Sequence, residues 1–166
     1  MTEYKAKTED NKCPFCEIAA GRFQTPGLFW ESEEFIAFLS IDPNTEGFSC
    51  IIPKKHFGSD VLKMPDDVLQ RFILASKKVA QILENYFEDV GRVGLMVEGT
   101  GIDHSHIKLV PLHGTEVLKY GGWQQFLSGK KFWFDKYEGW ISSGGGPKAD
   151  HEKLKELAEE LRKPQN

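Results

Sequence analysis

The chain has 166 residues, of which 40% are hydrophobic and 28% are charged, a composition typical of an ordinary globular protein of one domain. A formal net charge of -4 and the lack of a basic run give no electrostatic reason to expect a nucleic-acid partner. No apolar stretch approaches the ~18 residues needed to cross a membrane, so no membrane partner is expected either.

The N-terminal segment, residues 1–12, is polar and mixed in charge, and it has no apolar signal-peptide core. We predict a flexible arm there. The chain has three cysteines, two of them in Cys13-Pro-Phe-Cys16, and they do not make a disulfide framework. A reducing cytoplasm is therefore the expected compartment. A short helix is expected from Cys16 to Gly21, where the glycine ends it.

The next part of the chain predicts strands. Leu28–Glu31 and Phe35–Leu39 are apolar runs on either side of a Ser-Glu-Glu turn, which predicts an antiparallel hairpin. Residues 42–47 have the composition of a loop. Residues 48–53 form a nearly continuous apolar run, which is typical of a central strand.

The apolar spacing then changes to a helical period, which predicts one long amphipathic helix from about residue 65 to residue 87. Residues 94–98 predict another strand, and Gly99-Thr-Gly101 a tight turn before a fifth. The predicted fold class is α+β, with an antiparallel sheet of about five strands and one long helix packed against it.

The C-terminal part, residues 115–166, is rich in aromatic residues and glycine and holds three of the four tryptophans. A helix is expected at about residues 148–162. Because a free tail of this composition would expose many aromatic side chains to water, we expect an extension that packs on the domain.

The segment His104-Ser-His106-Ile-Lys108 is the strongest chemical signal in the chain. On a strand, the two imidazoles and the ammonium would share one face, because side chains alternate. An imidazole can be neutral and nucleophilic near neutral pH. A neighbouring lysine supplies positive charge for phosphate oxygens and disfavours protonation of the imidazole. This pattern indicates phosphate chemistry, and the alternative is a polar strand face lying in water.

Three motifs in this order resemble the histidine triad (HIT) superfamily of nucleotide hydrolases and transferases. They are Cys13-Pro-Phe-Cys16-Glu-Ile with Ala20-Gly21, Pro43 through Gly47 to Ile51-Ile-Pro-Lys-Lys-His56, and His104-Ser-His106-Ile-Lys108-Leu-Val-Pro111. The long predicted helix lies between the second and the third. The resemblance runs from Cys13 to about Gly114, so a HIT-like domain is expected over residues 13–114.

This sequence departs from the family pattern in three places. Lys108 stands where the family has its third triad histidine. Ser40 falls at the acidic residue that usually contacts the nucleotide ribose, with Asp42 two residues on. Gly99-Thr100-Gly101 replaces the usual glycine-glutamine-serine run. These departures concern positions that would contact the substrate, and they leave the fold assignment in place.

The resemblance implies a catalytic group of His104, His106, Lys108 and His113. His106 matches the middle histidine, which would attack an α-phosphorus and form a nucleotidyl-histidine intermediate. Lys108 would pair with phosphate oxygens. His113 is a candidate for the missing acid–base function, and an ordinary surface histidine is an equal alternative. Expected substrates are dinucleoside polyphosphates or nucleoside phosphoramidates.

In zinc-bearing members of the family, the residues that match Cys13, Cys16, His56 and His104 hold the metal, so a structural zinc is implied here. A Cys-x-x-Cys pair alone is a weak signal, because a tetrahedral zinc site needs two more ligands. The alternatives are an empty thiol pair and a redox motif. The redox reading expects a thioredoxin-like βαβ setting, which this pattern lacks.

The resemblance also indicates a nucleotide pocket and a homodimer. Apolar residues including Ile18 match the wall of the base pocket, and core packing explains them almost as well. The glycine turn could bring backbone N–H groups to a phosphate, and an ordinary hairpin turn is an equal alternative. The candidate substrate-binding residues are Phe15, Phe38, Ser40, Ile41, Asp42, Gly99, Thr100 and Gly101.

Two other classes of function remain open on the sequence. Lys108 and Ser40 are also compatible with a nucleotide-binding protein that has little or no turnover. The aromatic tail is compatible with a zinc-stabilised interaction protein. Nucleotide binding with and without turnover separates the first two classes, and the absence of nucleotide binding would leave the third.

Overall fold

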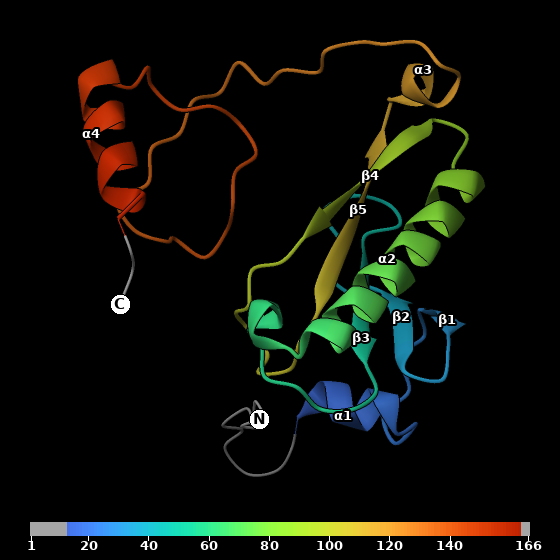
Figure 1. Cartoon of the computed structure of the whole chain (residues 1–166). Helices are drawn as coiled ribbons and strands as arrows, with labels where there is room; N and C mark the ends of the chain where they lie inside the picture. Colours follow the sequence, from blue (N-terminus) through green and yellow to red (C-terminus); the bar gives the residue numbers. More distant parts are fainter. Residues whose placement is uncertain (1–12, 164–166) are drawn as a thin grey trace. The chain divides into compact units, whose positions relative to one another are not determined.

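A computed structural model describes residues 13–163 of the chain (Figure 1). The predicted flexible arm, residues 1–12, lies outside the described residues. The chain divides into two compact units, and the division falls between Gln124 and Gln125. The boundaries expected from the sequence, and the packing of the extension on the domain, stay predictions.

Five antiparallel strands form a single sheet in the first unit (Figure 1). They are β1 (Leu28–Glu31), β2 (Phe35–Leu39), β3 (Ser49–Pro53), β4 (Val90–Met96) and β5 (Ile107–His113), in the spatial order β1-β2-β3-β5-β4. Every neighbouring pair in this order is antiparallel. The α+β class, the hairpin and the central position of the third strand are therefore confirmed.

The helices of the described chain are α1 (Pro14–Ala19), α2 (Asp66–Tyr86), α3 (Glu116–Lys119) and α4 (His151–Leu161), with a short 3-10 turn at Val61–Lys63. The long helix predicted over residues 65–87 is confirmed as α2. The short helix α3 and the 3-10 turn were not predicted, because neither is long enough to show a helical period. Among residues 13–163, no helix combines the length and apolar character needed to cross a membrane.

One face of the sheet is covered by α2, and the main hydrophobic core lies between them (Figure 1). The apolar side of α2 includes Phe72 and Val79, both fully buried. The ring of Phe72 stacks on Phe35 of β2 with 5.1 Å between ring centroids. Burying two such side chains contributes roughly 2 kcal/mol each, so this interface holds the helix on the sheet.

The other face of the sheet carries a smaller apolar cluster. Phe38 of β2 and Cys50 of β3 lie opposite each other in register, and Phe15 and Ile18 of α1 pack against them. Lys108 of β5 lies opposite Cys50 on the neighbouring strand pair. Residues that face each other across an antiparallel sheet point to the same side. Lys108 therefore lies on the α1 side of the sheet, away from α2.

Two strand boundaries differ from the sequence predictions. β4 begins at Val90 rather than Gly94, and its register is irregular between Val90 and Val93. Gly91 and Gly94 interrupt the alternation of side chains in this strand. β5 continues through Pro111, although a proline has no N–H group to donate to a strand ladder. The pairing of β5 with β3 stops at Leu109, so the proline has a strand neighbour on one side only, where proline is tolerated.

The fifth strand also starts later than predicted. It begins at Ile107, so His104 and His106 lie in the preceding loop and not on a strand face. The reason is the hydrogen bonding of that loop. The N–H of Ser105 donates to the carbonyl of Phe57, at 2.9 Å, so it is not available to a strand ladder.

The second unit has its own local structure. The rings of Phe132, Phe134 and Trp140 pack together with centroid distances of 5.0 to 5.9 Å. The helix α4 begins at His151, a little later than the expected residue 148. Its start is set by Asp150, whose carboxylate accepts hydrogen bonds from the N–H groups of Glu152 and Lys153 and caps the helix.

Candidate metal and histidine site

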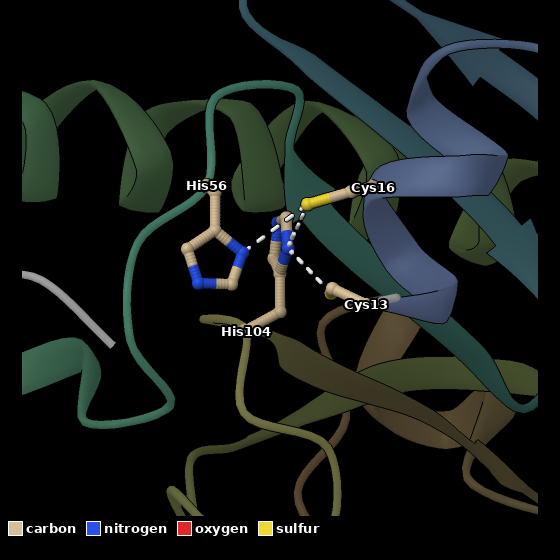
Figure 2. Close-up of side chains that lie close together, drawn as sticks. All are labelled: Cys13, Cys16, His56 and His104. Atoms are coloured by element: carbon tan, nitrogen blue, oxygen red, sulfur yellow. Dashed lines mark hydrogen bonds between the residues drawn. The ribbon is translucent and has the colours of Figure 1, made fainter. Parts of the chain in front are cut away.

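Four potential metal ligands lie close together in the first unit (Figure 2). Cys13 caps α1, and Cys16 lies in its first turn, so the helical spacing of three residues puts both sulfurs on one side. His56 comes from the loop after β3, and His104 from the loop before β5. Segments far apart in the sequence therefore meet at one place.

The distances between these ligand atoms suit a tetrahedral metal ion. Sγ of Cys13 lies 3.3 Å from Nδ1 of His104, and Sγ of Cys16 lies 3.2 Å from Nδ1 of His56 and 3.5 Å from Nδ1 of His104. All four ligand atoms lie within 4.8 Å of one another. A tetrahedral site with bonds of 2.0–2.3 Å separates neighbouring ligands by about 3.6 Å. The set therefore fits such an ion.

The hydrogen bond of His104 assigns its tautomer. Nε2 lies 2.8 Å from the carbonyl oxygen of Pro53, which can only accept, so the proton is on Nε2. Nδ1 then presents its lone pair to the two sulfurs. Burial lowers the pKa of His104 to about 4, which keeps the ring neutral. This is the form of histidine that binds metals.

The two cysteines and His56 also have the properties of metal ligands. Burial and the neighbouring Cys13 raise the pKa of the Cys16 thiol to about 12. Two adjacent thiolates in a buried place need a compensating cation, because the thiolate is the ligating form. His56 presents Nδ1 to Cys16, and its Nε2 is buried without a hydrogen-bond partner among the described residues. The donor set as a whole therefore fits a thiophilic metal.

His106 is held next to this group by a backbone contact. Its Nδ1 lies 2.8 Å from the carbonyl oxygen of His104, so Nδ1 carries the proton and Nε2 carries the lone pair. The residue is only 6% exposed. Burial lowers its pKa, the charge of Lys108 lowers it further, and the His104 carbonyl and Glu98 oppose the shift. The ring is thus neutral near pH 7, as a nucleophile must be.

Aromatic rings line the surroundings of the histidines. The ring of Phe15 makes edge contacts with the rings of His104, His106 and Phe38, at centroid distances of 5.8, 5.6 and 5.7 Å. Two expected pocket residues, Phe15 and Phe38, are therefore together. Ile41 is not part of this cluster, because its side chain is 78% exposed.

The loop after β2 contains the two residues expected near a ribose. The hydroxyl of Ser40 accepts a hydrogen bond from the N–H of Asp42, at 3.2 Å. The loop returns to β3 through a bond from the N–H of Ser40 to the carbonyl of Phe48. Asp42 is exposed, so its carboxylate is accessible to a ligand that binds from solvent.

The glycine turn before the histidines is braced by the loop after β3. Gly99 and Gly101 have positive φ angles of 68° and 86°, a conformation that favours glycine. The carboxylate of Asp103 accepts a hydrogen bond from the N–H of Ser59 at 2.9 Å, and the hydroxyl of Ser105 donates to the carbonyl of Gly58. These two polar side chains were missed by the sequence reasoning, since isolated Asp and Ser residues in a loop carry no distinctive pattern.

Lys108 has a partner that the sequence reasoning also missed. Its ammonium forms an ion pair with the carboxylate of Glu98, whose side chain is only 4% exposed, whereas that of Lys108 is 32% exposed. Glu98 follows the end of β4. A single acidic residue at the end of an apolar strand was the available signal.

His113 is not brought to this group. It ends β5, seven residues after His106, which corresponds to roughly 20 Å along a strand. Nδ1 lies 3.0 Å from a carboxylate oxygen of Asp89, and Nε2 lies 3.0 Å from the carbonyl oxygen of Glu46. Both ring nitrogens are occupied, so His113 cannot take up the expected acid–base function at His106 in this arrangement.

Comparisons with known proteins show which family the chain resembles. The sequence profile described as HIT domain matches residues 24–115. An uncharacterized HIT-like protein of Methanocaldococcus jannaschii is 33% identical over 118 residues, which cover 66% of this chain and 87% of the relative. The adenosine 5'-monophosphoramidase of Saccharomyces cerevisiae is 29% identical over 120 residues, covering 70% of this chain and 72% of the relative.

The fold is also shared with solved structures. The crystal structure of a member of the HIT family from Bacillus subtilis superposes with a TM-score of 0.62 and covers 94% of this chain and 99% of that chain. The sequence identity is 24%, so this likeness concerns the fold.

Proposed function

The chain belongs to the HIT domain family, and from this premise we propose that it is a nucleotide hydrolase or transferase that acts at the α-phosphate of a nucleotide conjugate. The observation that carries the proposal is the state of His106. Its ring is buried and neutral, and its Nδ1 proton is engaged by the His104 carbonyl, so Nε2 is ready to attack. The relatedness to a yeast adenosine 5'-monophosphoramidase supports phosphoramidates as one substrate class.

The reaction would proceed in two displacements. In the first, Nε2 of His106 bonds to the α-phosphorus, and the bond from phosphorus to the leaving group breaks. The leaving group departs with that electron pair and takes up a proton. In the second, a water oxygen bonds to the phosphorus and gives up a proton, and the bond to Nε2 breaks with its electron pair returning to the nitrogen. The products are a nucleoside monophosphate and regenerated His106.

We propose zinc as the metal held by Cys13, Cys16, His56 and His104. Two sulfur and two nitrogen ligands are typical of a structural zinc site, and four protein ligands leave no open position for substrate. Zinc would compensate the charge of the two thiolates. It would also link α1 to the loop after β3 and to the loop before β5. His104 would be fixed by its side chain, and its carbonyl would in turn orient His106.

The remaining site residues are proposed as contacts to the nucleotide. Phe15 and Phe38 would pack on the base, since both rings lie beside His106 or one another. The backbone of the glycine turn would approach the phosphates. The full proposed set is Phe15, Phe38, Ser40, Ile41, Asp42, Gly99, Thr100 and Gly101. A homodimer and a cytoplasmic location complete the proposal.

Turnover of a substrate panel tests the proposed activity. The panel contains adenosine and guanosine phosphoramidates and dinucleoside polyphosphates, assayed with the wild type and with His106→Ala. We expect release of nucleoside monophosphate by the wild type and a phosphate label trapped on His106 in a rapid quench. An inactive wild type, or equal rates for both proteins, would contradict the proposal.

A second candidate function is nucleotide binding with little turnover. The observation that favours it is the ion pair of Lys108, whose charge is partly compensated by Glu98 where the family has a histidine. Calorimetry with adenosine and guanosine monophosphate decides between the two, together with the same panel. Binding without release of product would support this second function.

A further inference from the structure

A buried carboxylate lies beside the catalytic histidine, and no step of the proposed reaction uses it. We propose that Glu98 is a positioning residue, whose carboxylate holds the ammonium of Lys108 beside His106 so that Lys108 can donate a proton to the leaving group. This inference rests on the proposed function. Lys108, and not His113, then supplies the acid–base function that the missing third histidine leaves open.

The strand pairing places the three groups together. Met96, the last residue of β4, lies opposite Lys108. Glu98 follows Met96 by two residues and His106 precedes Lys108 by two, and the charges of Lys108 and Glu98 both act on the ring of His106. Residues opposite and diagonal to each other across antiparallel strands share one face and lie within side-chain reach. The ion pair between Glu98 and Lys108 is the diagonal contact of this group.

The burial of the pair argues against a merely stabilising role. The carboxylate of Glu98 is 4% exposed, so it has lost most of its hydration. A buried ion pair commonly gains no stability over apolar residues of similar size, because desolvation offsets the attraction. The neighbouring face of the sheet is apolar, with Cys50 buried opposite Lys108 and Phe38 buried opposite Cys50. Stabilisation of the fold therefore does not explain the presence of this ion pair, which favours a functional role.

Lys108 extends from the buried carboxylate toward solvent. Its side chain is 32% exposed, and its ammonium has three N–H groups. One of them is engaged by Glu98. The others can point toward a phosphate oxygen or a leaving group bound at His106. An ammonium that is anchored at one N–H acts as an oriented donor and not as a mobile surface charge.

The proton balance of both displacements can be closed with Lys108. When the bond from phosphorus to the leaving group breaks, the leaving atom takes a proton from Nζ, which becomes a neutral amine. When water attacks the phosphorus in the second displacement, its proton goes to Nζ and the ammonium is restored. The carboxylate of Glu98 holds Nζ in position at the beginning and at the end of this cycle.

The experiment compares two leaving groups in variants of the pair. One substrate is a nucleoside phosphoramidate of an alkylamine, which needs a proton to leave. The other is the 4-nitrophenyl ester of the same nucleotide, whose phenolate leaves without one. We expect Glu98→Gln to lower kcat on the phosphoramidate by about 10²-fold and to change kcat on the ester by less than about threefold. The amide keeps the shape and an acceptor oxygen, and loses only the charge.

Two further variants and a control complete the test. Lys108→Met should show the same dependence on the leaving group. The double variant should be no slower than Lys108→Met, because the two residues act as a unit. Glu31→Gln removes an exposed ion pair with Lys54 outside the site and should leave both rates unchanged.

The outcomes separate this inference from the proposed function. Wild-type kcat on the phosphoramidate with Glu98→Gln, or equal losses on both substrates, overturns the positioning role while His106 remains the nucleophile. Restoration of activity in the double variant also overturns it, because that result indicates a structural pair. A wild type that turns over neither substrate overturns the proposed function, and the role of Glu98 with it.

Discussion

The two ends of β5 carry histidines in opposite environments. His106 immediately precedes the strand and is 6% exposed, and its burial lowers its pKa. His113 ends the strand, and its bonds to the Glu46 carbonyl and the Asp89 carboxylate raise its pKa. The same side chain is therefore neutral at one end and stabilised as a cation at the other. Environment, and not residue type, decides the chemistry of each.

The difference extends to the partners of each ring. Nε2 of His106 keeps its lone pair, because among the described residues it is Nδ1 that a backbone carbonyl engages. Both nitrogens of His113 donate to acceptors that lie far away in the sequence, at residues 46 and 89. His106, before the start of β5, therefore keeps a nitrogen available for chemistry. The hydrogen bonds of His113, at the end of β5, connect the strand to the segments that contain Glu46 and Asp89. Four predictions test this contrast.

The largest effect is expected at the first end. His106→Ala should lower turnover by about 10⁴-fold or more, because it removes the proposed nucleophile. His113→Ala is the matched control from the same strand and should keep kcat close to the wild-type value. Steady-state rates on the best substrate of the panel measure both. A comparable loss in the two variants would contradict the contrast between the ends.

Metal removal is expected to have the next largest effect. Cys13→Ser should lower the free energy of unfolding by about 4 kcal/mol, as losses of a metal site do. Purified wild type should contain about one zinc per chain by elemental analysis, and a chelator should lower its melting temperature.

The third cysteine supplies a control for this prediction. Cys50→Ala lies outside the ligand set and should keep the metal, with a packing loss of about 1 kcal/mol. The Cys13→Ser protein should not respond further to the chelator. Metal-free wild type that unfolds at an unchanged temperature would show that the cluster is an empty thiol pair.

A smaller loss is expected near the second end. Gly47 has φ of 75°, and a Cβ there would lie 2.5 Å from the Phe87 ring and 3.0 Å from Cγ of Pro111. Gly47→Ala should therefore cost about 3 kcal/mol of stability from strain and overpacking together. Gly114→Ala has a similar φ of 77° and nothing within 4 Å, so it should cost only about 1 kcal/mol. Denaturant titrations give both values, and equal losses would mean that the close approach is unimportant.

The smallest effect is a pH dependence at His113. Because its folded pKa is raised, the stabilisation from its charged form is present below the unfolded value of about 6.5 and is lost as the pH rises through the folded value. Asp89 has a lowered pKa, so its share is lost only as the pH falls below the usual carboxylate range. His113→Gln should therefore destabilise more at about pH 5.5 than at about pH 8.5. Thermal melts at both values check this, and an equal difference at both would refute it.

Much of the fold could be predicted because its signals are local. The hairpin of β1 and β2 and the long helix α2 follow from apolar periods of 2 and 3.6 residues. The four metal-ligand candidates were also identified in advance, through motif resemblance, and the structure brings them together. Errors came where local signals are weak, as in β4, where glycines interrupt the alternation.

The roles of the histidines needed the tertiary structure. The sequence placed His104, His106 and Lys108 on one strand face, whereas backbone bonding to Phe57 holds the first two in a loop. It also left His113 open, and it did not single out Glu98 at all. These assignments depend on which acceptor meets which nitrogen, and no short-range pattern contains that information.

The sequence by itself determined the elements, the apolar faces and the residue types available for chemistry, because these follow from side-chain spacing along a few turns or strand residues. Only the tertiary structure decided the protonated nitrogen of each ring, the partner of Lys108 and the separation of the two ends of β5. The contact between Cys13 and His104 joins residues 91 positions apart. Hydrogen bonds and ion pairs of this kind form between atoms that folding alone brings within about 3 Å.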